Sequence, residues 1–80
     1  MKKVTIQAEH GLHARPAATF VKMAQEIEGD VILKKGEKEA SAKSLMKLMS
    51  LGILQGDEVE VHAPCAESEE KLATFLEEMQ

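Results

Sequence analysis

Two spacings of apolar residues alternate along this chain, and their order constrains the fold more tightly than any other feature of the sequence. Apolar residues occupy every second position in residues 4–8 and 58–63, which predicts strands with one buried face. In residues 14–27 they recur every three or four positions, which predicts a helix with one apolar face. The chain therefore switches from strand to helix and back to strand within 80 residues.

Turn and capping signals complete the predicted order of elements. Residues 30–35 and 38–41 predict two further strands that are joined by a tight turn. Ser44 is expected to cap a short helix with Leu45 facing the core, and Ser68 is expected to cap a final helix. The predicted order is β-α-β-β-α-β-α.

The length of the chain limits how these elements can pack. A domain of 80 residues buries only about 60–65% of its unfolded surface, so residues 1–80 make a single domain with one core. Each strand offers one apolar face, and the helices offer matching apolar stripes. We therefore expect an α+β fold, an open-faced β-sandwich in which a four-stranded antiparallel sheet carries three helices on one face.

The composition excludes several classes of function. The formal net charge of −4 and the presence of only two aromatic residues, Phe20 and Phe75, disfavour nucleic-acid binding. No apolar run is long enough to span a bilayer, and the first residues lack the apolar stretch of a signal peptide. Cys65 is the only cysteine, so it cannot form an internal disulfide. We therefore expect a cytoplasmic protein without nucleic-acid binding or membrane insertion.

His13 stands directly before the first predicted helix, and its neighbours suit an anion. The first turn of a helix has unpaired backbone N–H groups at the positive end of the helix dipole, which attracts phosphate. Arg15 can reach the same anion with charged hydrogen bonds, and Gly11 permits a backbone conformation closed to other residues. A metal held by His10 and His13 would need a third ligand that the sequence does not make evident, so we predict no metal and no cofactor.

Two stretches of the chain resemble the signatures of a known family. Residues 11–18, Gly-Leu-His-Ala-Arg-Pro-Ala-Ala, look like the active-site signature of HPr, the histidine-containing phosphocarrier of the bacterial phosphoenolpyruvate-dependent sugar phosphotransferase system. Residues 43–53 resemble the second signature of that family, and the predicted order of elements matches its fold. The resemblance covers essentially the whole chain.

The resemblance implies a chemistry for His13. Enzyme I, charged by phosphoenolpyruvate, would pass its phosphoryl group to Nδ1 of His13, and the carrier would pass it on to EIIA domains of sugar transporters. Arg15 matches the arginine that assists this transfer. A silent paralogue has glutamine at the position of His13, so the histidine indicates an active carrier. Such a protein transfers the group stoichiometrically through a phosphohistidine and is not a stand-alone enzyme.

Ser44 matches the serine that HPr kinase/phosphorylase modifies in many members of the family. It can also cap its helix, and a phosphate there would act on docking rather than on folding. Methionines suit a docking surface that adapts to several partners, and lysines would form a basic rim around it. The residues expected to contact partners are Ala14, Pro16, Ala18, Phe20, Lys22, Lys43, Leu45, Met46, Lys47 and Met49.

Three other functions stay open at this point. A nitrogen-branch paralogue is one, although residues 43–48 favour the sugar branch. A regulatory interaction module that acts through Ser44 and Met46 is another, and a small ligand-sensing domain would need a pocket that this length scarcely permits. His10 stands where the family usually has asparagine, serine or threonine, and we expect it to face solvent. Cys65 is interpreted as an incidental thiol, and the chain is expected to be a monomer.

Overall fold

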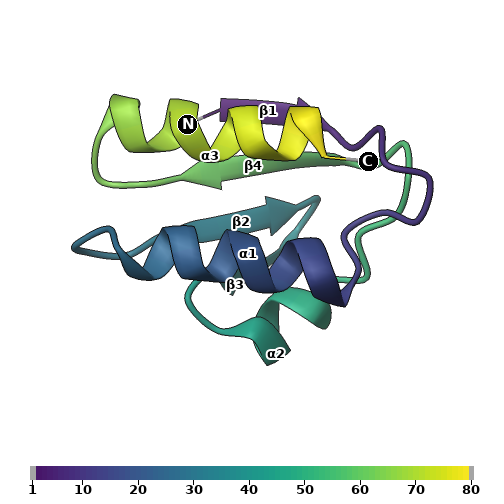
Figure 1. The fold of residues 1–80 in the computed structure, drawn as a ribbon, viewed down its shortest axis with the longest axis horizontal. Coiled ribbons are helices and arrows are strands. Elements are labelled where there is room, and N and C mark those ends of the chain that lie inside the picture. The colour runs from purple at the N-terminus through teal and green to yellow at the C-terminus, as the bar shows by residue number, and fades with distance from the viewer. Residues whose placement is uncertain (1, 80) are drawn as a thin grey trace.

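The computed structural model describes residues 2–79 and contains the elements in the predicted order (Figure 1). They are β1 (Lys2–Thr5), α1 (Ala14–Gln25), β2 (Ile32–Lys35), β3 (Lys38–Ser41), α2 (Leu45–Met49), β4 (Glu58–His62) and α3 (Ala66–Glu78). The predicted fold class and element order are confirmed. Within residues 2–79, no helix is long and apolar enough to cross a membrane.

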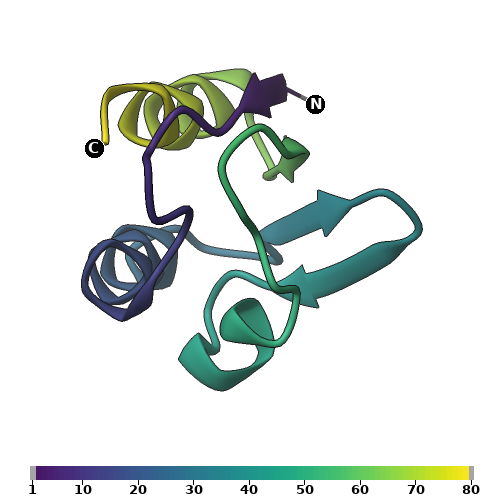
Figure 2. The same cartoon turned by 90° about the vertical axis from the view of Figure 1, so that its right-hand side faces the viewer.

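The strands form one four-stranded antiparallel sheet in the order β1-β4-β2-β3. In Figure 1, α1 and α3 lie in front of this sheet, and the turned view in Figure 2 places both on the same side of the strands. The short helix α2 packs against α1 and β3. The helices therefore cover one face of the sheet, as an open-faced sandwich requires.

The uncovered face of the sheet carries a row of alternating charges. In the register of the sheet, Lys3 lies opposite Glu60, Glu60 lies opposite Lys34, and Lys34 lies opposite Glu39. The row therefore crosses every strand. Opposite charges at directly opposed positions favour a strand pairing, and a slip by one residue would turn these charges into the core. The row therefore supports the observed register and explains why this face tolerates water.

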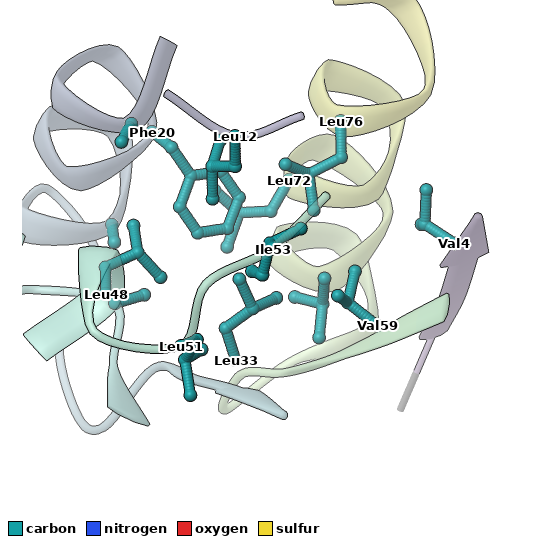
Figure 3. Close-up of a cluster of buried hydrophobic side chains, with 14 of the residues drawn as sticks. Val4, Leu12, Phe20, Leu33, Leu48, Leu51, Ile53, Val59, Leu72 and Leu76 are labelled. Atoms are coloured by element: carbon teal, nitrogen blue, oxygen red, sulfur yellow. The ribbon is translucent and has the colours of Figure 1, made fainter. Parts of the chain in front are cut away.

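The core fills the space between the sheet and the helices (Figure 3). Leu33 and Val59 enter it from the sheet, Phe20 from α1, and Leu72 and Leu76 from α3. All five side chains are almost completely buried. This packing fixes α1 on the sheet and thereby fixes the place where α1 begins.

Strand β1 is shorter than the alternation in residues 4–8 predicts. Beyond Thr5 the chain leaves the sheet and bonds to the turn before β4 instead. The Ile6 N–H donates to the Asp57 carbonyl at 2.9 Å, and the Ile6 carbonyl accepts from the Gly56 N–H at 2.8 Å. Ile6 and Ala8 stay buried, so the alternation correctly marks the buried side of this segment but not the end of the strand.

The prediction that Ser68 caps α3 is wrong. The cap is Cys65, whose Sγ accepts the Ser68 N–H at 3.4 Å, so the helix begins at Ala66. The hydrogen bond between Cys65 Sγ and Ser68 Oγ, together with the one from the Ser68 N–H, holds the pKa of the exposed thiol below its usual range. Cysteine is an uncommon cap, so a search for the usual capping residues selected the serine three positions later.

Candidate functional site

His13 is the residue from which α1 starts. Its backbone is extended, with φ −88° and ψ −179°, and its carbonyl accepts the Ala17 N–H at 2.9 Å. Within residues 2–79, no side chain caps this helix start and its first turn contains no acidic residue. The N–H groups of that turn are therefore available to an anion, and the exposed imidazole of His13 stands beside them.

The segment before His13 is fixed by a close backbone approach. Gly11 has φ +67°, and a Cβ atom there would overlap the Ile53 carbonyl oxygen and lie 2.8 Å from the Leu54 Cα. The next residue, Leu12, is buried and donates its N–H to the Ile53 carbonyl at 3.2 Å. The loop that leads from α2 to β4 therefore packs against the two residues before His13, and only glycine fits at position 11.

Arg15 and His10 stand on either side of His13 in the sequence, and both are exposed. Within residues 2–79, no carboxylate lies within ion-pair distance of the Arg15 guanidinium, so it is free to bind an anion. The ring centroids of His10 and His13 are 6.1 Å apart, and the ring planes meet at 79°. The exposure that we expected of His10 is confirmed, and its ring also borders that of His13.

Ser44 caps α2, as the sequence predicts. Its Oγ accepts the Lys47 N–H at 3.4 Å, and its carbonyl accepts the Leu48 N–H at 2.9 Å. The helix that follows has only five residues, and only Leu48 on it is buried. The prediction that Leu45 faces the core is wrong, because 38% of this residue is exposed.

Among residues 2–79, four large apolar residues are exposed, and they lie on α2 and on the loop that follows it. Met46 is 86% exposed and Leu54 is 63% exposed, with Leu45 and Met49 nearer 40%. Three of them come from α2, which packs against α1, and Leu54 comes from the loop that contacts Gly11. We call Leu45, Met46, Met49 and Leu54 the apolar patch.

Sequence reasoning missed Leu54. A signal for it existed, because Leu51 and Ile53 are buried while Gly52 and Leu54 between and after them are exposed. The alternation of this loop directs Leu54 outward. Exposed apolar patches on small proteins mark interaction sites, so Leu54 adds to the partner-binding candidates.

The other predicted contact residues fall into two groups. One group lies at or near the surface and can meet a partner: Ala14, Pro16, Ala18, Lys22 and Lys47. The second group, Phe20 and Lys43, makes contacts within the protein instead. Phe20 is completely buried, so its expected role as a partner contact is corrected to a core role. Lys43 is half-buried, and its Nζ donates to the Ile27 carbonyl at the end of α1.

The fold and the site define a class of protein: small open-faced sandwiches with an exposed histidine and arginine at an uncapped helix start. Residues 1–80 match the family model described as PTS HPr component phosphorylation site. The chain is 46% identical over 69 residues to phosphocarrier protein HPr of Vibrio cholerae serotype O1, covering 86% of this chain and 81% of that protein. The chain therefore belongs to the HPr family of phosphocarrier proteins in the phosphotransferase system.

Three further similarities extend this result. The chain is 42% identical over 80 residues to the HPr-like protein Crh of Bacillus subtilis strain 168, covering 96% of this chain and 94% of that protein. A crystal structure of Crh, described as a dimer with a swapped domain, matches with a TM-score of 0.77 at 42% identity over 100% of this chain and 95% of that one. The crystal structure of HPr from Bacillus anthracis strain Ames matches with a TM-score of 0.84 at 36% identity over 94% of this chain and 93% of that one.

Proposed function

We propose that His13 accepts a phosphoryl group from Enzyme I and passes it to EIIA domains that serve sugar uptake. The observation that carries this proposal is the start of α1, where, among the residues that the structure describes, no side chain caps the helix and no carboxylate pairs with Arg15, so the exposed imidazole, free backbone N–H groups and the Arg15 guanidinium occur within three residues. Membership of the HPr family supports the same chemistry.

In the first transfer, Nδ1 of the neutral His13 ring attacks the phosphorus of the phosphoryl group on Enzyme I. The bond between phosphorus and the donor breaks, and the donor leaves with the electron pair. The phosphoryl oxygens then meet the first-turn N–H groups and Arg15, which stabilise their negative charge. In the second transfer a nucleophilic side chain of EIIA attacks the phosphorus, the N–P bond breaks, and the neutral imidazole leaves with the electron pair. Both transfers therefore demand positioning and charge stabilisation more than further covalent chemistry.

The proposal is tested by incubating the chain with Enzyme I and phosphoenolpyruvate. We expect one phosphoryl group that is stable in base and lost in acid. His13→Ala should abolish labelling, whereas His10→Ala, which removes the imidazole 6.1 Å away, should retain it. Failure of the wild type to accept the group, or labelling of His13→Ala, would refute the proposal.

The apolar patch is our proposed docking surface for Enzyme I and EIIA. Met46 offers a flexible, exposed side chain that can pack against different partners, and Leu54 places apolar surface beside the His13 segment. Met46→Glu and Leu54→Glu should each weaken the binding of Enzyme I. Thr74→Glu, which adds the same charge at an exposed position of α3, is the matched control and should bind normally. Equal binding by all three variants would place docking elsewhere.

Ser44 is a proposed regulatory site for HPr kinase/phosphorylase. A phosphate on its Oγ would add a dianion directly before Leu45 and Met46 of the apolar patch, which disfavours the burial of that patch by a partner. Ser44→Asp should therefore weaken Enzyme I binding, whereas Ser44→Asn keeps a capping side chain without the charge and should not. Equal effects of the two substitutions would indicate a loss of the cap rather than a charge effect.

The similarity to Crh favours a regulatory interaction module, acting through Ser44 and Met46, as the second candidate function. The labelling experiment separates the candidates, because a purely regulatory protein would bind its partner without accepting a phosphoryl group on His13. We propose a cytoplasmic monomer, and analytical ultracentrifugation tests the oligomeric state. A concentration-dependent dimer would contradict the monomer.

A further inference from the structure

The loop between α2 and β4 is tied to the sheet by one lysine. Lys35 Nζ, at the end of β2, donates to the Gly52 carbonyl at 2.7 Å and lies 2.9 Å from Asp57 Oδ2. The two side chains are only 29% and 28% exposed. Lys35 therefore bridges the beginning and the end of this loop with a partly desolvated ammonium group, which strengthens both contacts.

Asp57 makes a second contact that shapes the same loop. Its Oδ2 accepts the Leu54 N–H at 2.8 Å, so one carboxylate oxygen holds both Leu54 and Lys35. The Leu54 N–H above all, and Lys35 after it, hold the pKa of Asp57 below its usual range. Asp57 is therefore charged at neutral pH. We call this arrangement the Lys35–Asp57 bracket.

The bracketed loop is the surface on which the His13 segment rests. The Ile53 carbonyl accepts the Leu12 N–H at 3.2 Å, and Gly11 packs directly against the backbone of Leu54. A continuous series of contacts thus runs from β2 through Lys35 and the loop to Leu12, the residue before His13. The same loop displays Leu54 in the apolar patch.

We propose that Lys35 and Asp57 are positioning residues for phosphoryl transfer at His13, acting through the loop that supports Gly11 and Leu12. This inference rests on the proposed function of His13. The bracket has two effects on that function: it holds the His13 imidazole in line for transfer, and it holds Leu54 where a partner docks. Misplacement of a reacting group by about 1 Å can slow a reaction by about 10²-fold, so a small shift of the loop is enough to lower the rate of phosphoryl transfer.

A second ion pair of the same chain provides the matched control. Lys2 Nζ on β1 and Glu70 Oε2 on α3 are 2.6 Å apart, and the two side chains are 47% and 61% exposed. This pair joins β1 to α3 and not β2 to the loop. Lys35→Met and Lys2→Met remove the same charge and keep a side chain of similar length. Only Lys35→Met removes a residue of the Lys35–Asp57 bracket.

The experiment measures transfer from phosphorylated Enzyme I and amide hydrogen exchange on the same samples. Lys35→Met should lower the first-order transfer rate by about ten-fold and raise the half-saturating concentration, because both His13 and Leu54 lose their support. The amides of Leu12 and Leu54 should exchange faster. Lys2→Met should change neither transfer nor these amides. Lys35→Arg, which keeps a donor and the charge, should restore most of the transfer rate.

Asp57→Asn keeps an acceptor for the Leu54 N–H but loses the charge that holds Lys35, so it should give an intermediate effect. If Lys35→Met and Asp57→Asn transfer at the wild-type rate, with the exchange of Leu12 and Leu54 unchanged, the bracket has no positioning role. Hydrogen exchange needs no phosphoryl donor. A wild type that accepts no phosphoryl group would refute the function of His13, whereas the exchange data would still decide whether the bracket holds the loop.

Discussion

Gly11→Ala is the substitution that most sharply tests how the His13 segment is held. An alanine at φ +67° is disfavoured by about 1–2 kcal/mol, because its Cβ approaches its own carbonyl oxygen. The added Cβ would also overlap the Ile53 carbonyl oxygen, and the atoms that must move belong to backbone rather than to a flexible side chain. Overpacking of this kind costs typically about 1–3 kcal/mol more.

The sum predicts a loss of about 2–5 kcal/mol of unfolding free energy for Gly11→Ala. An 80-residue domain has a total of only about 4–12 kcal/mol, so the substitution removes a large fraction of it. The melting temperature should fall by about 10 °C or more, since each kcal/mol shifts it by about 4–8 °C in a domain of this size.

Gly36→Ala is the matched control for this prediction. Gly36 has φ +60°, but within residues 2–79 no heavy atom other than those of Gly36 and its two chain neighbours lies within 4 Å of the position that its Cβ would occupy. Gly36→Ala should therefore lose only the unfolding free energy that the positive φ costs an alanine, about 1–2 kcal/mol. Urea unfolding followed by circular dichroism measures both variants, and transfer from Enzyme I should slow only in Gly11→Ala. Equal destabilisation of the two variants would refute the close approach of Gly11 to the loop.

Four further substitutions test the roles of Arg15, Phe20, Ser44 and Asp57. Arg15→Ala should slow phosphoryl transfer by about 10²-fold, with an unchanged urea midpoint, because the guanidinium is exposed and its proposed role is to stabilise the transferred charge; unaltered transfer would exclude that role. Phe20→Ala should lose about 3–5 kcal/mol of stability by opening a cavity, and a loss under 1 kcal/mol would contradict its core position. Ser44→Ala should lose about 1 kcal/mol through the missing cap, measured by urea unfolding. The folded pKa of Asp57 is lowered, so its carboxylate stabilises the fold above the unfolded pKa, near 3.8, and this contribution is lost as the pH falls through the folded value. The difference in urea midpoint between wild type and Asp57→Asn should therefore shrink in acid. A difference that stays constant with pH would refute this contribution of Asp57 to stability.

The order of elements could be predicted from the sequence because strand and helix periodicity are local properties. The alternation around Val59 and the three- and four-residue spacing around Phe20 are visible without any tertiary information. The same spacing places Phe20 on the buried face of α1 between Ala17 and Ala24, and its expected role as a partner contact neglected that constraint.

Contacts between segments that are distant in the sequence could not be predicted. Lys43 reaches the carbonyl of Ile27, and Lys35 reaches Gly52 and Asp57, through the tertiary fold alone. No local pattern distinguishes these lysines from the lysines that remain at the surface. Local signals therefore located His13 and its helix start, whereas the support beneath His13 became visible only in the structure.

The central claim is that the phosphoryl group is carried on Nδ1 of His13. It is tested most directly by ¹⁵N NMR of the histidine rings while the chain turns over with Enzyme I and phosphoenolpyruvate. We expect that Nδ1 of His13 alone changes to the phosphorylated form, and that this signal persists in His10→Ala and disappears in His13→Ala. A phosphoryl group on His10, or histidine rings that do not change while Enzyme I is phosphorylated, would contradict it.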